Sequence, residues 1–265
     1  MSISPTSVAP RRVVLVTGAA RRLGRTIALE LAEHGNAVAV HYRSSEADAQ
    51  ATVAAIRATG AAAQMFQADL SDEAACKALV PQVVAHFGRL DAVVNNASTF
   101  EYDDAASFSH AALDKHWRAN TAPAVLLAQA LHTHASRSNA NGCVVNIIDQ
   151  KLWNPNPDYF SYTLSKAALQ AATVMLAQAL APALRVCGVA PGVTLASGPM
   201  SEGEFEQAHR LTPLQRSSTP ADIAHAVRFL IESPAITGTT LLVDGGQHLA
   251  GQPRDVLYLA KTRKD

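Results

Sequence analysis

Residues 13–35, VVLVTGAARRLGRTIALELAEHG, place a short strand, a glycine turn and an amphipathic helix in immediate succession. VVLV is a β-branched run typical of a strand that is buried on both faces. Gly18 follows this strand, Gly24 opens the helical pattern, and Gly35 predicts its end. Such a turn leaves free backbone N–H groups and the positive end of a helix dipole at one point. The stretch predicts a nucleotide-phosphate site. From these glycines alone, a strand–helix turn that binds no ligand is an equally good interpretation.

Short strands continue to alternate with longer helices along the chain. We expect strands at 37–42, 63–67, 90–94, 143–148, 184–190 and 240–243. Helices are expected at 46–59, 71–87 (capped by Ser71), 113–134, 159–180 and 222–231. This alternation without hairpin signals implies right-handed crossovers and a parallel sheet. The predicted fold class is α/β, a single-domain doubly wound parallel sheet of Rossmann type with helices on both faces.

The segments outside this alternation are few. Residues 1–12 are rich in Ser and Pro and predict a flexible leader rather than a signal peptide, so the domain is expected to span 13–265. Residues 193–218 show no clear pattern and suit a substrate lid. The acidic residues of the loops are expected on solvated faces and are assigned no role: Asp103, Asp104, Glu202, Glu204 and Glu206.

The composition points to a small-molecule ligand. Lys plus Arg and Asp plus Glu both total 22, so the chain lacks the basic excess of a nucleic-acid binder. No apolar run approaches the roughly 20 residues of a membrane helix. The three cysteines lack C-x-x-C spacing, and His132 and His134 would point to different sides of a helix, so we expect no metal site. These features favour a cytoplasmic protein.

Tyr162 and Lys166 lie four residues apart in the helical segment YTLSK and therefore share one helix face. A nearby ammonium group favours the phenolate and lowers the tyrosine pKa toward a value useful for proton transfer. The alternative is an exposed Tyr and Lys on a solvated helix. Their position after a buried strand favours an acid/base pair.

Five motifs in order now resemble the landmarks of the short-chain dehydrogenase/reductase family: TGAARRLG, NNAS, Asn120, YTLSK and Pro191–Gly192. The similarity spans Val13 to about Leu249. The resemblance implies Tyr162 as the acid/base and Lys166 as the residue that holds the nicotinamide ribose and tunes the tyrosine. It also implies that Asn120 organises a proton-relay water.

The same resemblance implies where a nicotinamide cofactor binds. The phosphates would lie over the glycine turn, adenine near Asp69 and Leu70, and nicotinamide near Asn95 and the Pro191–Gly192 turn. The cofactor-binding set is Gly18, Arg21, Arg22, Leu23, Gly24, His41, Tyr42, Arg43, Ser44, Ser45, Asp69, Leu70, Asn96, Ala97, Ser98, Tyr162, Lys166, Pro191, Gly192 and Val193.

The end of the second strand indicates which cofactor this is. An acidic residue there would bind the ribose 2′-OH of NAD and repel a 2′-phosphate. This chain instead offers Arg43, Ser44 and Ser45, and Arg21 could add a second charge. The predicted cofactor is NADPH.

Two departures from the general family pattern resemble the pteridine reductases. Arg22 replaces a glycine within TGxxxGxG, and Asp149 replaces the serine thirteen residues before the tyrosine. NNAS is followed by the aromatic Phe100, and Tyr159 matches a substrate-side tyrosine of that subgroup. The implied substrate-binding set is Arg22, Ser98, Phe100, Asp149, Tyr159 and Tyr162.

These residue types suit a pterin, which is a flat polar heterocycle. Phe100 could stack on the ring, Arg22 could bridge ring and phosphate, and Asp149 could relay a proton to a ring nitrogen. Each has a structural alternative: Phe100 as core, Arg22 as a solvated helix start, and Asp149 as a turn former at a strand end.

The sequence therefore predicts NADPH-dependent reduction of a dihydropterin, such as dihydrobiopterin or dihydromonapterin, with dihydrofolate as a further candidate. The first alternative is an NADPH-dependent reductase of a ketone or 3-oxoacyl thioester, and the second is a non-catalytic NADPH-binding regulator. The resemblance also implies a homotetramer.

Overall fold

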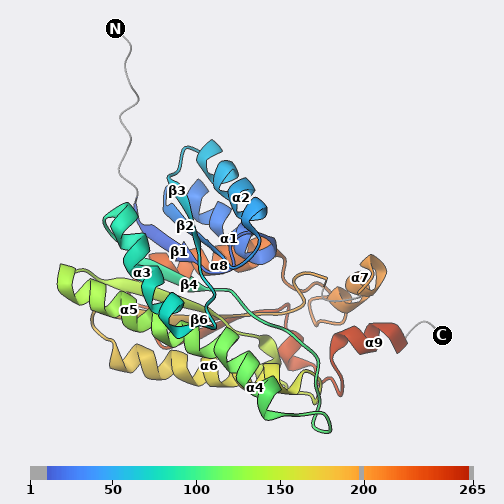
Figure 1. Ribbon diagram of the computed structural model, residues 1–265. Coiled ribbons are helices and arrows are strands. Elements are labelled where there is room, and N and C mark those ends of the chain that lie inside the picture. Colours follow the sequence, from blue (N-terminus) through green and yellow to red (C-terminus); the bar gives the residue numbers. More distant parts are fainter. Residues whose placement is uncertain (1–10, 197–199, 263–265) are drawn as a thin grey trace.

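The computed structural model describes residues 11–196 and 200–262, so most of the predicted leader lies outside the described residues. A seven-stranded parallel sheet forms its centre, in the order β3-β2-β1-β4-β5-β6-β7 (Figure 1). The strands are β1 (Val13–Val16), β2 (Ala37–Tyr42), β3 (Ala63–Gln67), β4 (Ala92–Asn95), β5 (Gly142–Ile147), β6 (Leu184–Pro191) and β7 (Thr240–Val243). The predicted doubly wound α/β fold is confirmed.

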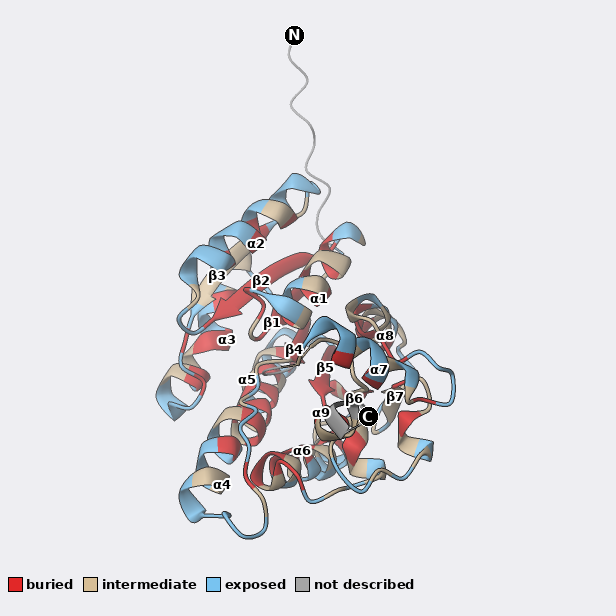
Figure 2. Ribbon diagram, turned by 90° about the vertical axis from the view of Figure 1, so that its right-hand side faces the viewer, coloured by how far each residue is buried: buried red, intermediate tan, exposed pale blue. Residues whose placement is uncertain are grey.

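Two layers of helices cover the sheet. One face packs against α1 (Arg22–Glu33), α2 (Glu46–Ala58) and α8 (Pro220–Glu232). The other packs against α3 (Glu73–Phe87), α5 (Ala122–Ser138) and α6 (Phe160–Ala179). Figure 2 shows buried residues on the strands and on the inward sides of these helices, as a sheet buried on both faces requires.

The strand order reverses between β1 and β4, which are neighbours although two strands separate them in sequence. Val16, the last residue of β1, pairs with Val40 of β2 on one side and Val94 of β4 on the other. The turns after these three strands therefore meet at one edge of the sheet. A crevice for a ligand is expected at such a reversal.

The predicted helix at 113–134 is wrong in its continuity. The chain forms α4 (His110–His116), a π-helical turn η1 (Trp117–Thr121) and then α5. A π turn is a local widening that often marks a functional site, and no apolar periodicity announces it. The predicted cap of α3 is also wrong, because Asp72 accepts the Ala75 N–H at 2.7 Å while the Ser71 hydroxyl donates to Asp69.

The segment predicted as a patternless lid contains α7 (Glu202–Arg210), and residues 197–199 within it lie outside the described residues. Ser201 and Glu204 form a capping box at its start, so Glu204 is buried and not on a solvated face. A C-terminal helix not predicted from the sequence, α9 (Val256–Thr262), packs against α7 (Figure 1). Two short 3₁₀ turns, η2 (Gln150–Trp153) after β5 and η3 (Gln247–Leu249) after β7, contact each other.

The prediction for Asp103 is wrong as well. Its carboxylate is buried and accepts hydrogen bonds from the backbone N–H and the hydroxyl of Ser161. A search of the described helices finds none that is long and apolar enough to span a membrane.

Candidate functional site

Two adjoining cavities lie beyond the carboxyl ends of the strands. The first has a volume of about 410 Å³ and follows the turns after β1, β2 and β4. The second has a volume of about 290 Å³ and extends over β5, α6 and the segments after β6 and β7. Both are lined by Arg22, Leu23, Asn96 and Ser98, so together they form one elongated crevice. We call its two parts the cofactor end and the substrate end.

The glycine turn at the cofactor end has no room for side chains. Gly18 adopts a φ of +63°, a conformation that favours glycine. A Cβ on Gly24 would lie 2.3 Å from the Gly18 carbonyl oxygen and 2.5 Å from the Asn96 amide nitrogen. Glycine at these positions thus lets the start of α1 pack directly against the turns after β1 and β4, with both glycines on the lining of the cavity.

Neutral hydrogen bonds hold these turns together. The Thr17 hydroxyl oxygen accepts the backbone N–H groups of Asn96 at 2.9 Å and Ala97 at 3.0 Å. His41 Nδ1 accepts the Gly18 N–H at 3.0 Å, so its Nε2 carries the proton that is donated to the Ala68 carbonyl at 3.1 Å. Burial lowers the pKa of His41 to about 4, so this ring is neutral and structural.

The far rim of the cofactor end carries cationic and hydroxyl groups. Arg21, Arg43 and Ser44 are exposed there, beside the half-buried Ser45. On the neighbouring loop, hydrogen bonds from the Ser71 hydroxyl and backbone hold the pKa of Asp69 below its ordinary value. Arg43 lies near enough to Asp69 to act on its pKa, and the cationic and hydroxyl groups that directly follow β2 suit a phosphate monoester.

At the substrate end, Tyr162 donates its hydroxyl proton to Asp149 Oδ2 at 2.8 Å. Asp149 follows β5 and also accepts the Lys151 N–H at 2.8 Å, while Tyr162 comes from the first turn of α6. The Lys166 ammonium lies one turn further along and donates to the Ile147 carbonyl at 2.8 Å. A carboxyl group, a phenol and an amine therefore converge on one buried wall of the cavity.

Burial dominates the ionisation of this group. It raises the pKa of Asp149 above its ordinary value and lowers that of Lys166 to about 8. Burial, followed by the neighbouring Asp149 carboxylate, raises the pKa of Tyr162 well above its ordinary value. The predicted lowering of the tyrosine pKa by Lys166 is thus wrong for this chain, because burial and Asp149 outweigh the ammonium.

Two asparagines face away from both cavities. The Asn120 amide accepts the Thr99 N–H at 2.7 Å and donates to Ser165 Oγ at 3.0 Å, so it ties the loop after β4 to α6. Its predicted part in a proton relay stays a prediction. Asn95 donates to Asn146 Oδ1 at 2.8 Å inside the sheet and lines neither cavity, so its placement near nicotinamide is not supported.

Aromatic rings form the opposite wall of the substrate end. Phe100 stacks on Tyr159 with ring centroids 4.1 Å apart and meets the Tyr162 ring edge-on at 4.7 Å. Phe100 is 42% exposed, so its reading as a core residue is wrong. Arg22, whose φ is 54°, spans the crevice and donates to the Ala196 carbonyl at 2.8 Å.

Nearly all residues predicted for the site line the crevice. The cofactor end contains the predicted set from Gly18 to Ser98, and the substrate end contains Tyr162, Lys166, Pro191, Gly192, Val193 and the predicted substrate residues. The sequence analysis did not identify Lys151 or the residues near the C-terminus that line the substrate end, because they belong to no motif. The missed residues of the substrate end that bear polar side chains are Gln150, Lys151, Asn154, Asn156, Thr194, Gln247, Gln252 and Asp255.

Comparison with known proteins gives a consistent result. A family described as enoyl-(acyl carrier protein) reductase matches residues 18–248. Pteridine reductase 1 of Leishmania tarentolae is 35% identical over 290 residues, covering 94% of this chain and 99% of the relative. A granaticin polyketide synthase putative ketoacyl reductase 2 of Streptomyces violaceoruber is 36% identical over 245 residues, covering 89% and 96%.

Among solved structures, the chain is similar to FolM alternative dihydrofolate reductase 1 from Brucella canis, which was complexed with NADP. The TM-score is 0.88 at 40% identity, covering 94% of this chain and 99% of that chain. These proteins share one fold and family but act on different substrate classes, so the site itself has to distinguish among them.

Proposed function

Because the chain belongs to the short-chain dehydrogenase/reductase family, we propose that it is an NADPH-dependent reductase of a dihydropterin. One observation carries the proposal: the hydrogen bond from Tyr162 to Asp149 at the buried wall of the substrate end. A serine at position 149 could only hydrogen-bond a substrate oxygen, whereas a carboxyl group can also transfer a proton to a nitrogen.

The residues of the cofactor end fit NADPH. The glycine turn and the N-terminus of α1 line this end and suit the diphosphate, and Arg21 and Arg43 offer donors to a 2′-phosphate beside Ser44. Lys166 and the Pro191–Gly192 turn line the adjoining part of the substrate end, where the nicotinamide would lie. The FolM relative in complex with NADP supports this cofactor.

The reduction adds two hydrogens across a C=N bond of the ring. When bound, NADPH supplies the hydride that the ring carbon accepts. Asp149 passes a proton to the adjacent ring nitrogen, and burial, which raises the pKa of this carboxyl group, suits it to the role of a general acid. The Tyr162 hydroxyl, which donates to Oδ2, and the charge of Lys166 stabilise the carboxylate that remains.

The other groups of the substrate end hold the ring. Phe100 presents an exposed aromatic face for stacking, and Tyr159 packs behind it. Arg22 lines both ends of the crevice, so its planar guanidinium can contact cofactor phosphate and ring edge together. The proton chemistry, the stacking face and the shared arginine all suit a pterin.

The second candidate is reduction of a 3-oxoacyl thioester or ketone, which the similarity to a ketoacyl reductase favours. In that reaction Tyr162 would protonate the carbonyl oxygen, and Asp149 would have no chemical role. The homotetramer, the cytoplasmic location and a single domain over 13–265 stay predictions.

The test is oxidation of NADPH, and separately of NADH, by purified protein with dihydrobiopterin, dihydromonapterin, dihydrofolate or acetoacetyl-CoA. We expect pteridine turnover with NADPH and a fall of about 10²-fold in kcat for Asp149→Ser. Tyr162→Phe serves as the control, because it should impair either reaction.

Turnover of the thioester alone, with equal rates in the Asp149→Ser variant, would reject the pteridine proposal in favour of the second candidate. Binding of NADPH without turnover of any of the four compounds would favour the non-catalytic regulator.

A further inference from the structure

The C-terminal segment closes one side of the substrate end. Residues 250–257, which we call the C-terminal wall, follow β7 and lie beyond the region matched by the family. Asp255, Val256 and Leu257 line the same cavity as Asp149 and Tyr162. The wall therefore contacts whatever part of a substrate extends outward from the reacting ring.

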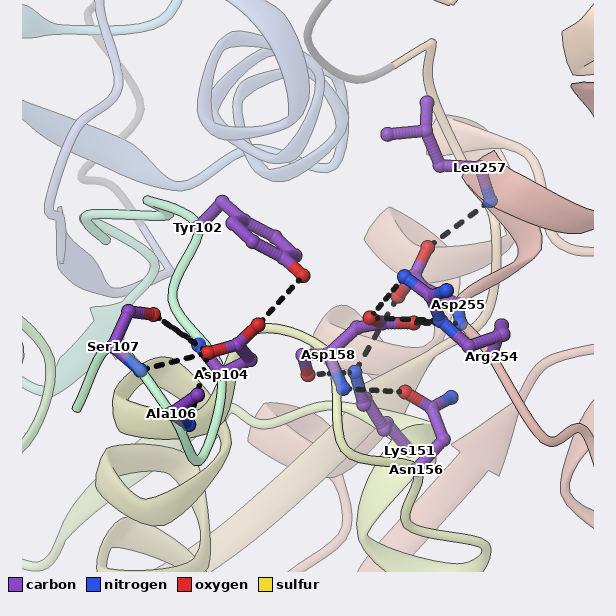
Figure 3. Close-up of polar contacts among 10 residues, drawn as sticks. All are labelled: Tyr102, Asp104, Ala106, Ser107, Lys151, Asn156, Asp158, Arg254, Asp255 and Leu257. Atoms are coloured by element: carbon purple, nitrogen blue, oxygen red, sulfur yellow. Dashed lines mark hydrogen bonds and ion pairs between the residues drawn. The ribbon is translucent and has the colours of Figure 1, made fainter.

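Charged groups fix this wall in place. The Asp158 carboxylate, 3% exposed, accepts hydrogen bonds from Arg254 Nε and Nη2, both at 2.8 Å, and from the Asp255 N–H at 2.7 Å (Figure 3). Lys151 donates to the Asp158 carbonyl and lies 3.5 Å from Asp255 Oδ2. The buried charges of Lys151 and Asp158, both in the segment between β5 and α6, thus determine the position of Asp255.

Asp255 presents its carboxylate to the cavity from the start of α9. Its Oδ1 accepts the Leu257 N–H at 3.1 Å, and the side chain is 20% exposed (Figure 3). The charge acts on the site, because after burial it is the largest cause that raises the pKa of Tyr159, and it also raises the pKa of Tyr162.

The carboxylate also balances Lys151, whose side chain is 5% exposed and also lines the cavity. Without Asp255, Lys151 would lose its ion-pair partner at the cavity, and more of its positive charge would act on the substrate. A positive charge beside the cavity attracts an anionic group of the substrate. Asp255 therefore controls how the outer part of the cavity discriminates between neutral and anionic substrates.

We propose that Asp255 is a specificity-determining residue that disfavours substrates with an anionic tail and so favours pterins with a neutral side chain. This inference rests on the proposed function, since it assigns the ring to Asp149 and the side chain of the pterin to the C-terminal wall. It adds a substrate class to that proposal, namely unconjugated dihydropterins in preference to folates.

The experiment compares kcat/KM for dihydrobiopterin, which has a neutral side chain, and dihydrofolate, which carries a glutamate, in the parent protein and in Asp255→Asn. The two substrates share the reacting ring. Asparagine can still accept the Leu257 N–H, so α9 keeps its cap. We expect the ratio of dihydrofolate to dihydrobiopterin activity to rise about 5-fold, mainly through KM, and the gain to shrink at high salt.

Asp104→Asn is the matched control. Asp104 lines neither cavity, and its carboxylate accepts the N–H groups of Ala106 and Ser107 and the Tyr102 hydroxyl (Figure 3). This variant removes the same charge and should leave the ratio unchanged. An unchanged ratio in Asp255→Asn, or equal losses with both substrates, would overturn the inference and leave Asp255 with only its capping role.

Failure of the proposed function is visible separately as a lack of turnover of either pteridine by the parent protein. The comparison then uses acetoacetyl-CoA, which carries phosphates, against the neutral N-acetylcysteamine thioester. The same 5-fold shift would retain charge selection by Asp255 for the second candidate function. An unchanged ratio there would reject it.

Discussion

The two ends of the crevice are built from different kinds of structure. The cofactor end is formed by the turns after β1, β2, β3 and β4, and neutral hydrogen bonds that Thr17 and His41 accept from backbone N–H groups hold it together. The substrate end is formed by segments far apart in the chain, and the ion pairs Arg254–Asp158 and Lys151–Asp255 hold it together. Neutral hydrogen bonds between side chains and backbone fix the first end, and ion pairs between charged side chains fix the second.

This difference has a chemical reason. Every dinucleotide presents the same phosphates, so a backbone cradle at a strand reversal serves them all. Substrates differ from one family member to the next, and charged side chains on separate loops can change without disturbing the sheet. The two ends should therefore respond differently to the same kind of perturbation.

The largest difference is expected for added volume at a glycine. Gly24→Ala should lower the free energy of unfolding by about 3 kcal/mol, because its Cβ would collide with the Gly18 backbone and Asn96. NADPH affinity should fall with it. Urea unfolding and cofactor titration measure the two effects.

Gly203→Ala is the control at a glycine that lines neither end of the crevice. Gly203 lies in α7, and nothing lies within 4 Å of the position of its Cβ. Alanine should raise the free energy of unfolding by about 0.5–1 kcal/mol, since it is the better helix former. Equal effects of the two substitutions would show that the loss of stability in Gly24→Ala does not come from close packing at the glycine turn.

The same contrast explains what the sequence could predict. The strands 37–42, 63–67 and 240–243 are observed with the predicted bounds, because short apolar runs bounded by turn residues suffice to define them. The cofactor end follows from these strands and from two glycines. Local patterns therefore predicted the fold class and the glycine turn, and the family resemblance predicted the other residues of the cofactor end and several of the substrate end, among them Asp149, Tyr159 and Tyr162.

The rest of the substrate end and the π turn beside it depend on contacts that no local pattern contains. Asp255 takes its position from Arg254 and Asp158, which are 96 residues apart in the chain. The apolar periodicity predicted one continuous helix over 113–134, but a π turn at Asn120 interrupts it. The hydrogen bonds of Asn120 with Thr99 and Ser165 hold Asn120 in this turn. Such features become visible only when the fold has brought the partners together.

A smaller effect is expected from acidification, which acts on the cofactor end through His41. The folded-state pKa of about 4 lies below the ordinary value of 6.5, because the buried ring is neutral. Protons bind the unfolded chain first, so the contribution of His41 is fully present above pH 6.5 and is lost as the pH falls toward 4. Between pH 7 and 5 we expect a loss of about 2 kcal/mol in the free energy of unfolding.

Urea unfolding at several pH values measures this loss, with His41→Asn as the test variant. Asparagine can accept the Gly18 N–H without titrating, so its unfolding free energy should vary less between pH 7 and 5. The exposed His110, replaced by Gln, should retain the full dependence of the parent. An identical pH dependence in the His41 and His110 variants would show that the cofactor end gains nothing from the neutral ring.

The smallest effect is expected at the ion pair that anchors the C-terminal wall. Asp158→Asn removes the negative charge that Arg254 pairs with. An amide oxygen in the place of Oδ2 could still accept Arg254 Nε and the Asp255 N–H, but an amide nitrogen in the place of Oδ1 cannot accept Arg254 Nη2. Water can take over part of the bonding of Arg254, which is 47% exposed, so the thermal midpoint should fall by only about 2–4 °C. The KM for the pterin should rise several-fold as the C-terminal wall loosens, while NADPH affinity should stay unchanged because the cofactor end shares none of these residues.

Asp114→Asn is the control: it breaks the exposed pair with Arg118 and should change neither the KM for the pterin nor the NADPH affinity. Loss of NADPH affinity in Asp158→Asn equal to the loss for the pterin would mean that the two ends are not independent, and that the ion pairs support the whole crevice.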